Sequence, residues 1–316
     1  DNRPGVNTLH PQKEVCLLLT FKEYRYERPA MEELEAEFNR LLNAFSQAAS
    51  GAGQEAAMKE INALRSEFES MSTLARIRHS LDTTDPYYRA ENDFFDEVAP
   101  VYEGLIHRYY QALVGSPYRP ALEAKLGKQL FRLAELQLKT FSPEIIGDLQ
   151  TENKLVSEYT RLRASARIWF EGEERNLAQM EPFLEAKERD RRKSAQEAYT
   201  GFFLANEEEF DRIYNQLVNV RDQIARKLGF KNFVEVGYAR LGRSDYNAEM
   251  VAGYRRQIRE TLVPLAAKLR RLQAAEAQVP PFDPLATAPV LPAPDPPPLA
   301  QAASRPARPS TATLAT

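Results

Sequence analysis

Histidine is well suited to hold a metal or to move a proton at neutral pH, and the sequence contains His10, His79 and His107. None of them is followed by glutamate, and none has a second histidine four residues away, so the H-E-x-x-H zinc motif is absent. Glu103 and His107 lie four residues apart on one predicted helix face, but a di-iron bundle needs Glu-x-x-His on two helices and further glutamates. We therefore predict structural or surface histidines and no metal ligand in this chain.

The other patterns that could support catalysis fail because of their surroundings. Cys16 is the only cysteine, so no internal disulfide can form, and we expect no ordered element to hold it. Residues 51–56 (GAGQEA) fit a dinucleotide-binding fingerprint formally, but they stand between two predicted helices and do not follow a strand. Neither a phosphate-binding G-x-x-x-x-G-K-[ST] nor a G-x-S-x-G nucleophile motif occurs. The sequence thus predicts no catalytic and no cofactor-binding residue.

Runs of like charge are numerous and are best explained as solvated helix faces. The acidic ones include Glu32, Glu33, Glu171, Glu173, Glu174, Glu207, Glu208 and Glu209, and a basic run contains Lys187, Arg189, Arg191, Arg192 and Lys193. Acids interleave with the bases, and the net charge of −3 gives no global field that would attract nucleic acid. No uncharged stretch approaches the length of a membrane span. We predict a cytoplasmic protein with neither nucleic-acid nor membrane partners.

The two ends of the chain differ in composition from the middle. Residues 1–19 show no amphipathic period, and residues 278–316 hold 11 of the 21 prolines. Proline at this density blocks helix and sheet interiors, so we predict a disordered Pro/Ala-rich tail. Two explanations stay open for it. It is a natural tail, or the reading frame is lost near residues 271–277, as Pro/Ala/Arg-rich peptide from GC-rich DNA suggests. In the second case the native start lies near Leu19.

Between these ends, apolar residues recur at helical spacing and predict a mainly α body of antiparallel helices with short loops. Proline and Asx or Ser signals mark where the helices begin. The predicted segments are a helix opened by Arg28-Pro29, helices over about 54–81, 86–114, 119–126, 128–140 and 142–164, one or two helices over 187–228, a short helix over 232–241, and a last helix from Asn247 interrupted at Pro264.

One block, residues 164–199, breaks this helical period. Ala166 to Phe170 is short, aromatic and β-branched, Gly172 can make a turn, and a polar run follows with Leu177 and Met180 as its apolar points. This pattern predicts a β-hairpin near residues 166–180. An isolated hairpin is marginally stable in water, so it must pack against helices or further strands. We expect Trp169 and Phe170 to serve packing and the surrounding glutamates to be surface groups.

Several segments, in order along the chain, resemble the oligoendopeptidase F family, zinc metallopeptidases related to thimet oligopeptidase. The segments are 21–29 (FKEYRYERP), 77–88 (IRHSLDTTDPYY), 142–165 (SPEIIGDLQTENKLVSEYTRLRAS), the hairpin block and 233–247 (FVEVGYARLGRSDYN). Together they extend over about residues 20–270. The resemblance implies a helical, two-lobed fold around a channel in which short unstructured peptides are hydrolysed. In the family, zinc is held by H-E-x-x-H on a helix plus a downstream glutamate.

The resemblance implies that this chain corresponds to the N-terminal half of the family, one lobe of the channel. It divides the sequence into a non-native-looking leader (1–19), an N-terminal helical domain including the hairpin (20–186), the start of the peptidase domain before the zinc motif (187–277) and the tail (278–316). No catalytic, cofactor-binding or metal-binding residue of the family can be assigned here. We therefore expect no bound zinc and no activity from this chain alone.

Two hypotheses for function remain. The first is the N-terminal portion of a zinc metalloendopeptidase, which lacks the catalytic half and would need a complementing catalytic fragment. The second is a non-enzymatic helical module that binds peptides or partners through its channel wall. Loss of the catalytic half should uncover apolar surface that the full fold buries, and exposed patches of that size mark interfaces or aggregation. A helical fragment that is monomeric and unfolds cooperatively would support the second hypothesis.

Overall fold

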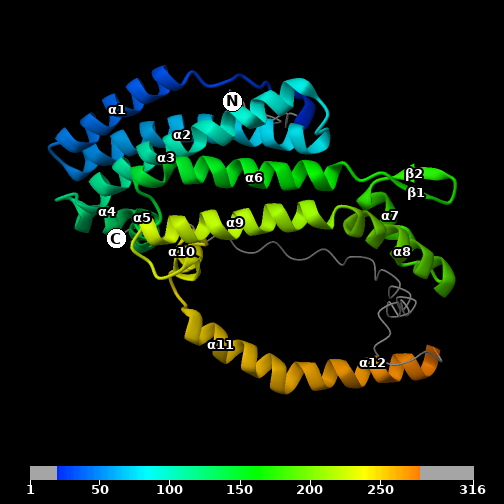
Figure 1. The fold of residues 1–316 in the computed structure, drawn as a ribbon. Helices are drawn as coiled ribbons and strands as arrows, with labels where there is room; N and C mark the ends of the chain where they lie inside the picture. Colours follow the sequence, from blue (N-terminus) through cyan, green and yellow to red (C-terminus); the bar gives the residue numbers. More distant parts are fainter. Residues whose placement is uncertain (1–19, 278–316) are drawn as a thin grey trace, which may run out of the picture. The chain divides into compact units, whose positions relative to one another are not determined.

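Helices dominate residues 20–277, the part of the chain that the computed structural model describes (Figure 1). The predictions for the leader 1–19, with His10 and Cys16, and for the tail 278–316 concern residues outside this range. The chain separates into two compact units, one ending at Phe131 and the other beginning at Arg132. The mainly α fold with one short hairpin, predicted from sequence, is confirmed.

The first unit is built from long helices whose starts are fixed by local capping. Its elements are a 3₁₀ turn η1 (Phe21–Glu23), α1 (Met31–Gln47), α2 (Gly51–Leu81), α3 (Pro86–Val114) and α4 (Arg119–Leu126). The Ser50 hydroxyl accepts a hydrogen bond from the Gly53 amide, which places the start of α2 three residues before the predicted one. Asp85 caps α3 in the same way, ahead of Pro86. Pro29 precedes α1 and does not open it, because Ala30 is the N-cap.

Aromatic side chains fill the core between α1, α2 and α3. Phe68 of α2 stacks on Tyr102 of α3 with ring centroids 4.0 Å apart, and it meets Phe95 edge-on at 5.7 Å. Phe45 of α1 meets Tyr109 of α3 edge-on at 5.9 Å. Offset and edge-to-face pairs of this kind add to the free energy gained from burying the rings. These ring contacts join α1, α2 and α3 around one aromatic core.

The extended segment before α1 is attached to α3 by a buried carboxylate. Glu91 is 3% exposed, and the Arg28 guanidinium donates to both of its oxygens at 2.9 and 2.6 Å. Tyr26 also donates its hydroxyl to Glu91, and Arg28 lies over the Phe94 ring at 4.6 Å. The Arg28 hydrogen bonds hold the pKa of Glu91 below its usual value despite burial. The FKEYRYERP segment is thus a structural strap.

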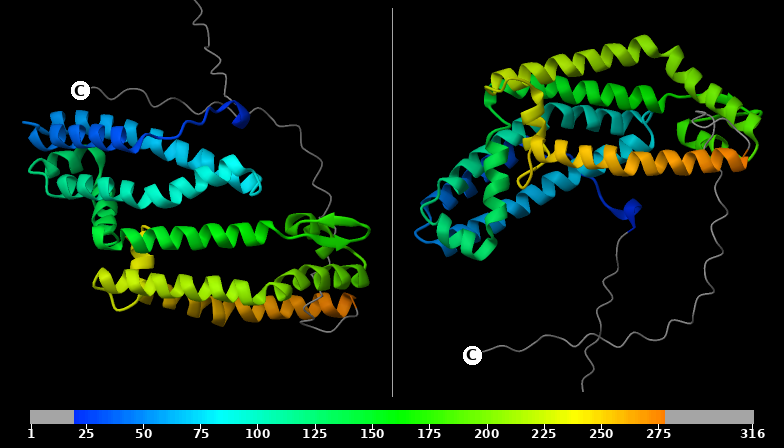
Figure 2. Two further views of the ribbon diagram at one scale, coloured as in Figure 1. Left: turned by 45° about the horizontal axis from the view of Figure 1, so that its top comes forward. Right: turned by 90° about the horizontal axis from the view of Figure 1, so that it is seen from below.

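The second unit is organised around the pair α6 and α9, which lie side by side in both figures (Figures 1 and 2). Its elements follow α5 (Lys128–Leu138): η2 (Pro143–Ile145), α6 (Ile146–Ala164), β1 (Ile168–Phe170), β2 (Glu173–Arg175), α7 (Leu177–Leu184), α8 (Arg189–Ala205), α9 (Glu207–Lys227), α10 (Phe233–Arg240), α11 (Ala248–Gln257), η3 (Ile258–Leu262) and α12 (Val263–Ala277). A cluster including Leu149, Leu155, Val220 and Ile224 forms the interface between α6 and α9.

Asn206 separates the segment 187–228 into two helices in series, one of the two alternatives that the periodicity left open. Its side-chain amide donates to the Phe202 carbonyl at 2.8 Å, and its own carbonyl accepts from the Phe210 amide. Glu207, Glu208 and Glu209 then form the first turn of α9, where carboxylates interact favourably with the positive end of the helix dipole.

Gly229 ends α9 through a hydrogen-bond pattern that requires a left-handed residue. Its φ is +83°, its amide donates to the Arg226 carbonyl, and the amide of Phe230 donates to the Ala225 carbonyl. These two bonds define a Schellman motif, in which glycine avoids the steric penalty of other residues. The predicted cap is therefore confirmed.

The last predicted helix is interrupted as expected, but by a π-helical turn. Pro264 has no N–H to donate, and in a regular α-helix its ring would clash with the carbonyl four residues earlier. The wider turn η3 precedes it, so that α11 and α12 continue as one rod (Figure 1). Within residues 20–277 no helix is both long and apolar enough to cross a bilayer.

Glu152 is the buried ionic centre of the second unit. Its carboxylate accepts from Arg221 of α9 at 2.7 Å and from Arg240 of α10 at 2.8 Å, and its side chain is 9% exposed. The Phe233 ring lies beneath both guanidinium groups, at 5.6 and 5.2 Å. One carboxylate on α6 therefore fixes two other helices.

We expect Glu152→Gln to lower the free energy of unfolding by about 1–3 kcal/mol, because a buried charged hydrogen-bond acceptor is lost. The matched control is Glu158→Gln on the same helix, whose contact with Arg212 at 2.6 Å is more than one-third exposed. That change should cost less than about 1 kcal/mol. Urea denaturation followed by circular dichroism measures both. Equal losses in the two variants would contradict the assignment.

Acid should remove the contribution of Glu152. Burial alone would raise the pKa of Glu152, but Arg240 and Arg221 outweigh it and hold the pKa below its ordinary value of 4.5. The unfolded state then binds the proton at higher pH than the folded state, so the stabilisation is complete above pH 4.5 and disappears as the pH falls through the lower folded value. The gap in urea midpoint between the wild type and Glu152→Gln should therefore narrow between pH 7 and pH 3. A gap independent of pH would contradict this.

Candidate functional site

His79 and His107, the two histidines within residues 20–277, lie apart from any metal-binding arrangement. His79 is buried in α2, and His107 is half-buried in α3, where desolvation lowers its pKa. Glu103, one turn before His107, faces solvent. Among residues 20–277 no group of three or more His, Cys, Asp or Glu side chains is placed to hold a metal ion. The side chains of this described part of the chain therefore do not fit a zinc site.

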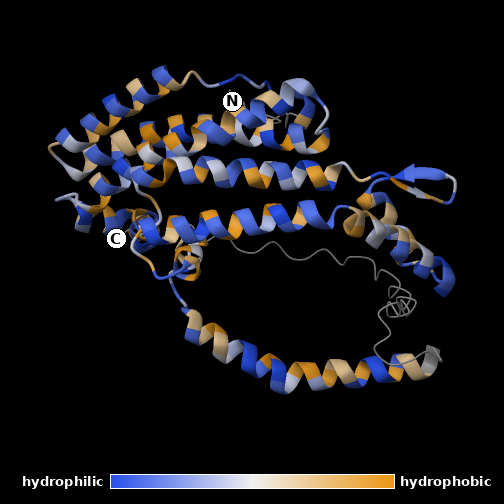
Figure 3. Cartoon of the chain, viewed as in Figure 1, coloured by the Kyte–Doolittle hydropathy of each residue, from blue (hydrophilic) through white to orange (hydrophobic). Residues whose placement is uncertain are grey.

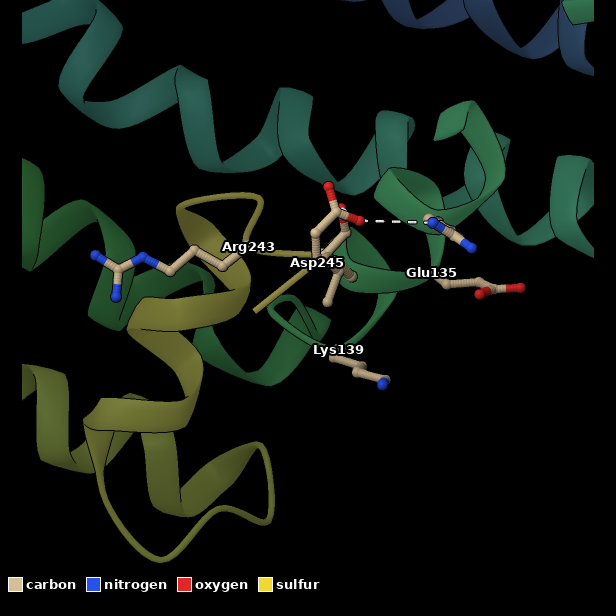
Figure 4. A pocket seen from close by; sticks show the side chains of 7 residues that line it. Glu135, Lys139, Arg243 and Asp245 are labelled. Atoms are coloured by element: carbon tan, nitrogen blue, oxygen red, sulfur yellow. Dashed lines mark hydrogen bonds and ion pairs between the residues drawn. The ribbon is translucent and has the colours of Figure 1, made fainter. Parts of the chain in front are cut away.

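A charged hollow of about 520 Å³ lies between α5 and the loop after α10 (Figure 4). It is lined by Arg132, Glu135, Lys139, Arg243 and Asp245, with Arg132 and Asp245 paired at 3.5 Å. In the figure the side chain of Arg243 extends away from those of Glu135 and Lys139. Charges of both signs that do not converge on one point give neither a general base nor an anion site.

The hairpin between α6 and α7 is the more specific feature (Figure 1). Its register pairs Ile168 with Arg175 and Phe170 with Glu173, which leaves Glu171 and Gly172 as a two-residue loop. Both loop residues have positive φ, +51° and +82°. That combination is the type I′ turn that suits the twist of paired strands. The strands are confirmed, but the predicted 166–180 segment ends in helix, because Asn176 caps α7 with a capping box.

Arginines secure the hairpin loop to the helices that follow it. Arg191 of α8 donates to both carboxylate oxygens of Glu171 at 2.6 Å, and these bonds hold the pKa of Glu171 below its usual value. The Phe183 ring of α7 receives two guanidinium groups, Arg175 at 4.5 Å and Arg191 at 4.9 Å. Residues of the basic run thus stabilise local structure, as Arg192 also does by donating to the Ala186 carbonyl at 2.6 Å.

The two faces of β1 differ sharply. Ile168 and Phe170 are buried in a cluster with Leu177, Met180 and Ala195, which seats the hairpin on α7 and α8. Trp169 points the other way, and 73% of its surface is exposed. The expectation that Trp169 serves packing is therefore wrong. The period of two along a strand sends it to the opposite face from its neighbours.

Beside Trp169 lies a hollow of about 520 Å³, which we call the hairpin groove. Its apolar lining comes from β1 and from one face of α8. The residues are Ile168, Trp169, Ala198, Gly201, Phe202 and Ala205. Sequence reasoning missed this groove, although small residues at positions 198, 201 and 205 recur at helical spacing and leave room on that face.

Comparison with known families assigns the class of the fold. Residues 21–141 match the Peptidase M3 N-terminal domain. This segment contains the strap, α1 to α5 and the aromatic core described above. The comparison with curated proteins gave no match.

Solved structures then narrow the resemblance to oligoendopeptidase F, which confirms the family expected from the sequence. PZ peptidase A with an inhibitor is 58% identical, with a TM-score of 0.81 over 82% of this chain and 46% of that one. A 3.1 Å X-ray structure described as oligoendopeptidase F is 57% identical, with a TM-score of 0.81 over 83% of this chain and 46% of that one. A structure described as an oligoendopeptidase F from Bacillus anthracis strain Ames is 53% identical, with a TM-score of 0.82 over 85% and 49%. This chain spans less than half the length of these relatives and corresponds to their N-terminal part.

The Glu171–Arg191 contact should control the local stability of the hairpin. Arg191→Gln removes the bidentate pair, and we expect the amides of β1 and β2 to exchange about two- to fivefold faster, as befits a half-exposed ion pair. Hydrogen exchange followed by mass spectrometry measures this. The control is Lys193→Gln on the same helix, whose ion pair with Glu197 is long at 3.9 Å. Equal exchange rates in the two variants would show that the Glu171–Arg191 ion pair does not stabilise the hairpin.

Proposed function

We propose that this chain is the N-terminal portion of an oligoendopeptidase F-like zinc metalloendopeptidase that hydrolyses short, unstructured peptides inside a channel. The identity of 58% to PZ peptidase A over 82% of this chain is the observation that supports it most strongly. In this proposal residues 20–186 form the N-terminal domain, and residues 187–277 begin the peptidase domain. The helices described here supply one wall of the channel, and the whole peptidase acts in the cytoplasm.

In this proposal the zinc chemistry is supplied by polypeptide outside these 316 residues. A zinc ion in such a peptidase polarises the scissile carbonyl and activates water. This sequence contains no H-E-x-x-H, and residues 20–277 hold no group of metal ligands. We therefore propose that this chain binds no catalytic zinc and is inactive by itself.

An uncovered apolar row along α11 and α12 supports a complementing catalytic fragment as partner (Figure 3). Large apolar side chains, each more than half exposed, recur along the two helices: Tyr254, Leu262, Leu265, Leu269 and Leu272. Spacings of three and four residues from Leu262 onward place them on one helix face.

Such a row indicates an interface, because exposed contiguous apolar surface is otherwise rare on a soluble protein. The oligoendopeptidase structures continue for roughly as many residues again as this chain matches, since the match covers 46–49% of them. We propose that the corresponding catalytic polypeptide covers the row.

Activity measurements test the main proposal. The purified chain should give no cleavage of a fluorogenic oligopeptide above the buffer rate, with or without added zinc. Mixing it with the separately expressed remainder of the Bacillus anthracis oligoendopeptidase F, itself assayed alone, should produce chelator-sensitive cleavage. Chelator-sensitive cleavage by the chain alone would contradict the assignment, and so would a mixture no more active than the added fragment.

Charge introduced into the apolar row should block that complementation. We expect Leu265→Glu with Leu269→Glu to leave the urea midpoint of the isolated chain nearly unchanged, because these side chains are exposed, yet to weaken fragment association at least about tenfold. The matched control is Lys268→Glu on the same helix. Association is measured by analytical ultracentrifugation. Association that is unaffected by the double variant would show that the row is not the interface.

A further inference from the structure

The backbone of β1 offers an unpaired edge at Trp169. In a hairpin with a two-residue loop, the residues that flank the loop form a hydrogen-bonded pair, and the type of pair then alternates along the strands. Phe170 and Glu173 flank the loop here, so Trp169 and Glu174 form a non-hydrogen-bonded pair. The N–H and C=O of Trp169 therefore point away from β2. Among residues 20–277 no third strand pairs with them.

The hairpin groove lies beside this edge. A strand added along β1 would place its side chains alternately on the two faces of the sheet. Those on the inner face would lie beside Ile168 and over Ala198, Gly201 and Ala205 of α8, and those on the outer face would lie beside Trp169. The groove has space for such side chains, because a Cβ built on Gly201 meets no atom within 4 Å.

We propose that the free edge of β1 and the hairpin groove bind an oligopeptide in extended form by strand addition, with an apolar side chain in the groove. The inference rests on the proposed function in taking a peptide as ligand. The unpaired N–H and C=O of the edge can form hydrogen bonds with the backbone of an added peptide. Alternate side chains of that peptide would enter the groove and give selectivity among peptides. The strand is only three residues long, so it can pair with a short peptide segment and not with a long sheet.

The chain reports on this site directly, since Trp169 is its only tryptophan. The probe is a blocked heptapeptide that alternates leucine and serine, titrated into the full chain while tryptophan emission is recorded. We expect a saturable blue shift, because the bound strand shields the indole of Trp169, a residue that is 73% exposed in the free chain. The same peptide with N-methyl groups on alternate residues, in both registers, cannot pair with the edge and should bind at least about tenfold more weakly.

A matched pair of variants separates groove binding from non-specific adsorption. Gly201→Leu fills the groove without strain, since Gly201 is helical and its surroundings are open. Gly147→Leu makes the same change on α6, also with open space around the new Cβ. We expect about tenfold weaker peptide binding in the first variant and wild-type binding in the second. Equal binding of the two peptides, equal binding by the two variants, or no emission change at saturating peptide would each overturn the proposal.

The outcome is independent of the test of the proposed function. Complementation that restores cleavage while Gly201→Leu leaves peptide binding unchanged would remove this site and leave the peptidase assignment standing. Edge-dependent peptide binding without any complementation would support this site and contradict the peptidase assignment.

Discussion

The second unit depends on one buried carboxylate. Glu152 on α6 accepts from Arg221 of α9 and Arg240 of α10, and the Phe233 ring packs under both guanidinium groups. A buried charge without partners would be strongly unfavourable, so Glu152 favours the arrangement of the three helices that brings both arginines to it. The ends of these helices then set the positions of the neighbouring elements of the second unit. α6 leads into the hairpin, α9 follows α8 through Asn206, and α10 leads into the rod of α11 and α12.

Most of the helical body could be predicted because its signals are local. Asp85-Pro86, Ser142-Pro143 and Gly229 act through capping and backbone geometry within one turn, and the structure uses each as expected. The start of α1 was misplaced because Ala30, a residue with no side-chain acceptor, is its N-cap. The sequence predicts part of α7 as the return of the hairpin, up to about residue 180. Its capping box, Asn176 with Gln179, was visible in the sequence but competed with a strand-like polar run.

The hairpin shows what local signals leave undecided. Alternation along β1 fixes that Trp169 opposes Ile168 and Phe170, but it does not say which face meets the rest of the protein. The contacts with α7 and α8 decide which face is buried, because Met180 and Ala195 pack against Ile168 and Phe170. The groove likewise forms only where the small residues of α8 pack beside the strand. That packing is a tertiary contact, which local sequence signals do not determine. The absence of a zinc motif, by contrast, could be established from the sequence alone, because it concerns residue types and not their positions.

An exposed strand edge normally invites aggregation, so its persistence here needs a physical reason. β1 is short, and charged groups surround it: Arg167 contacts Glu174 at 3.3 Å, and Glu171 is tied to Arg191. These groups hinder the continuous pairing that fibrils require, while the backbone of Trp169 stays open between them. The geometry therefore tolerates one short extended segment at a time. The peptides of the proposed function are likewise short chains without a fold of their own, so the size of the hairpin edge is compatible with the peptide that we propose it binds.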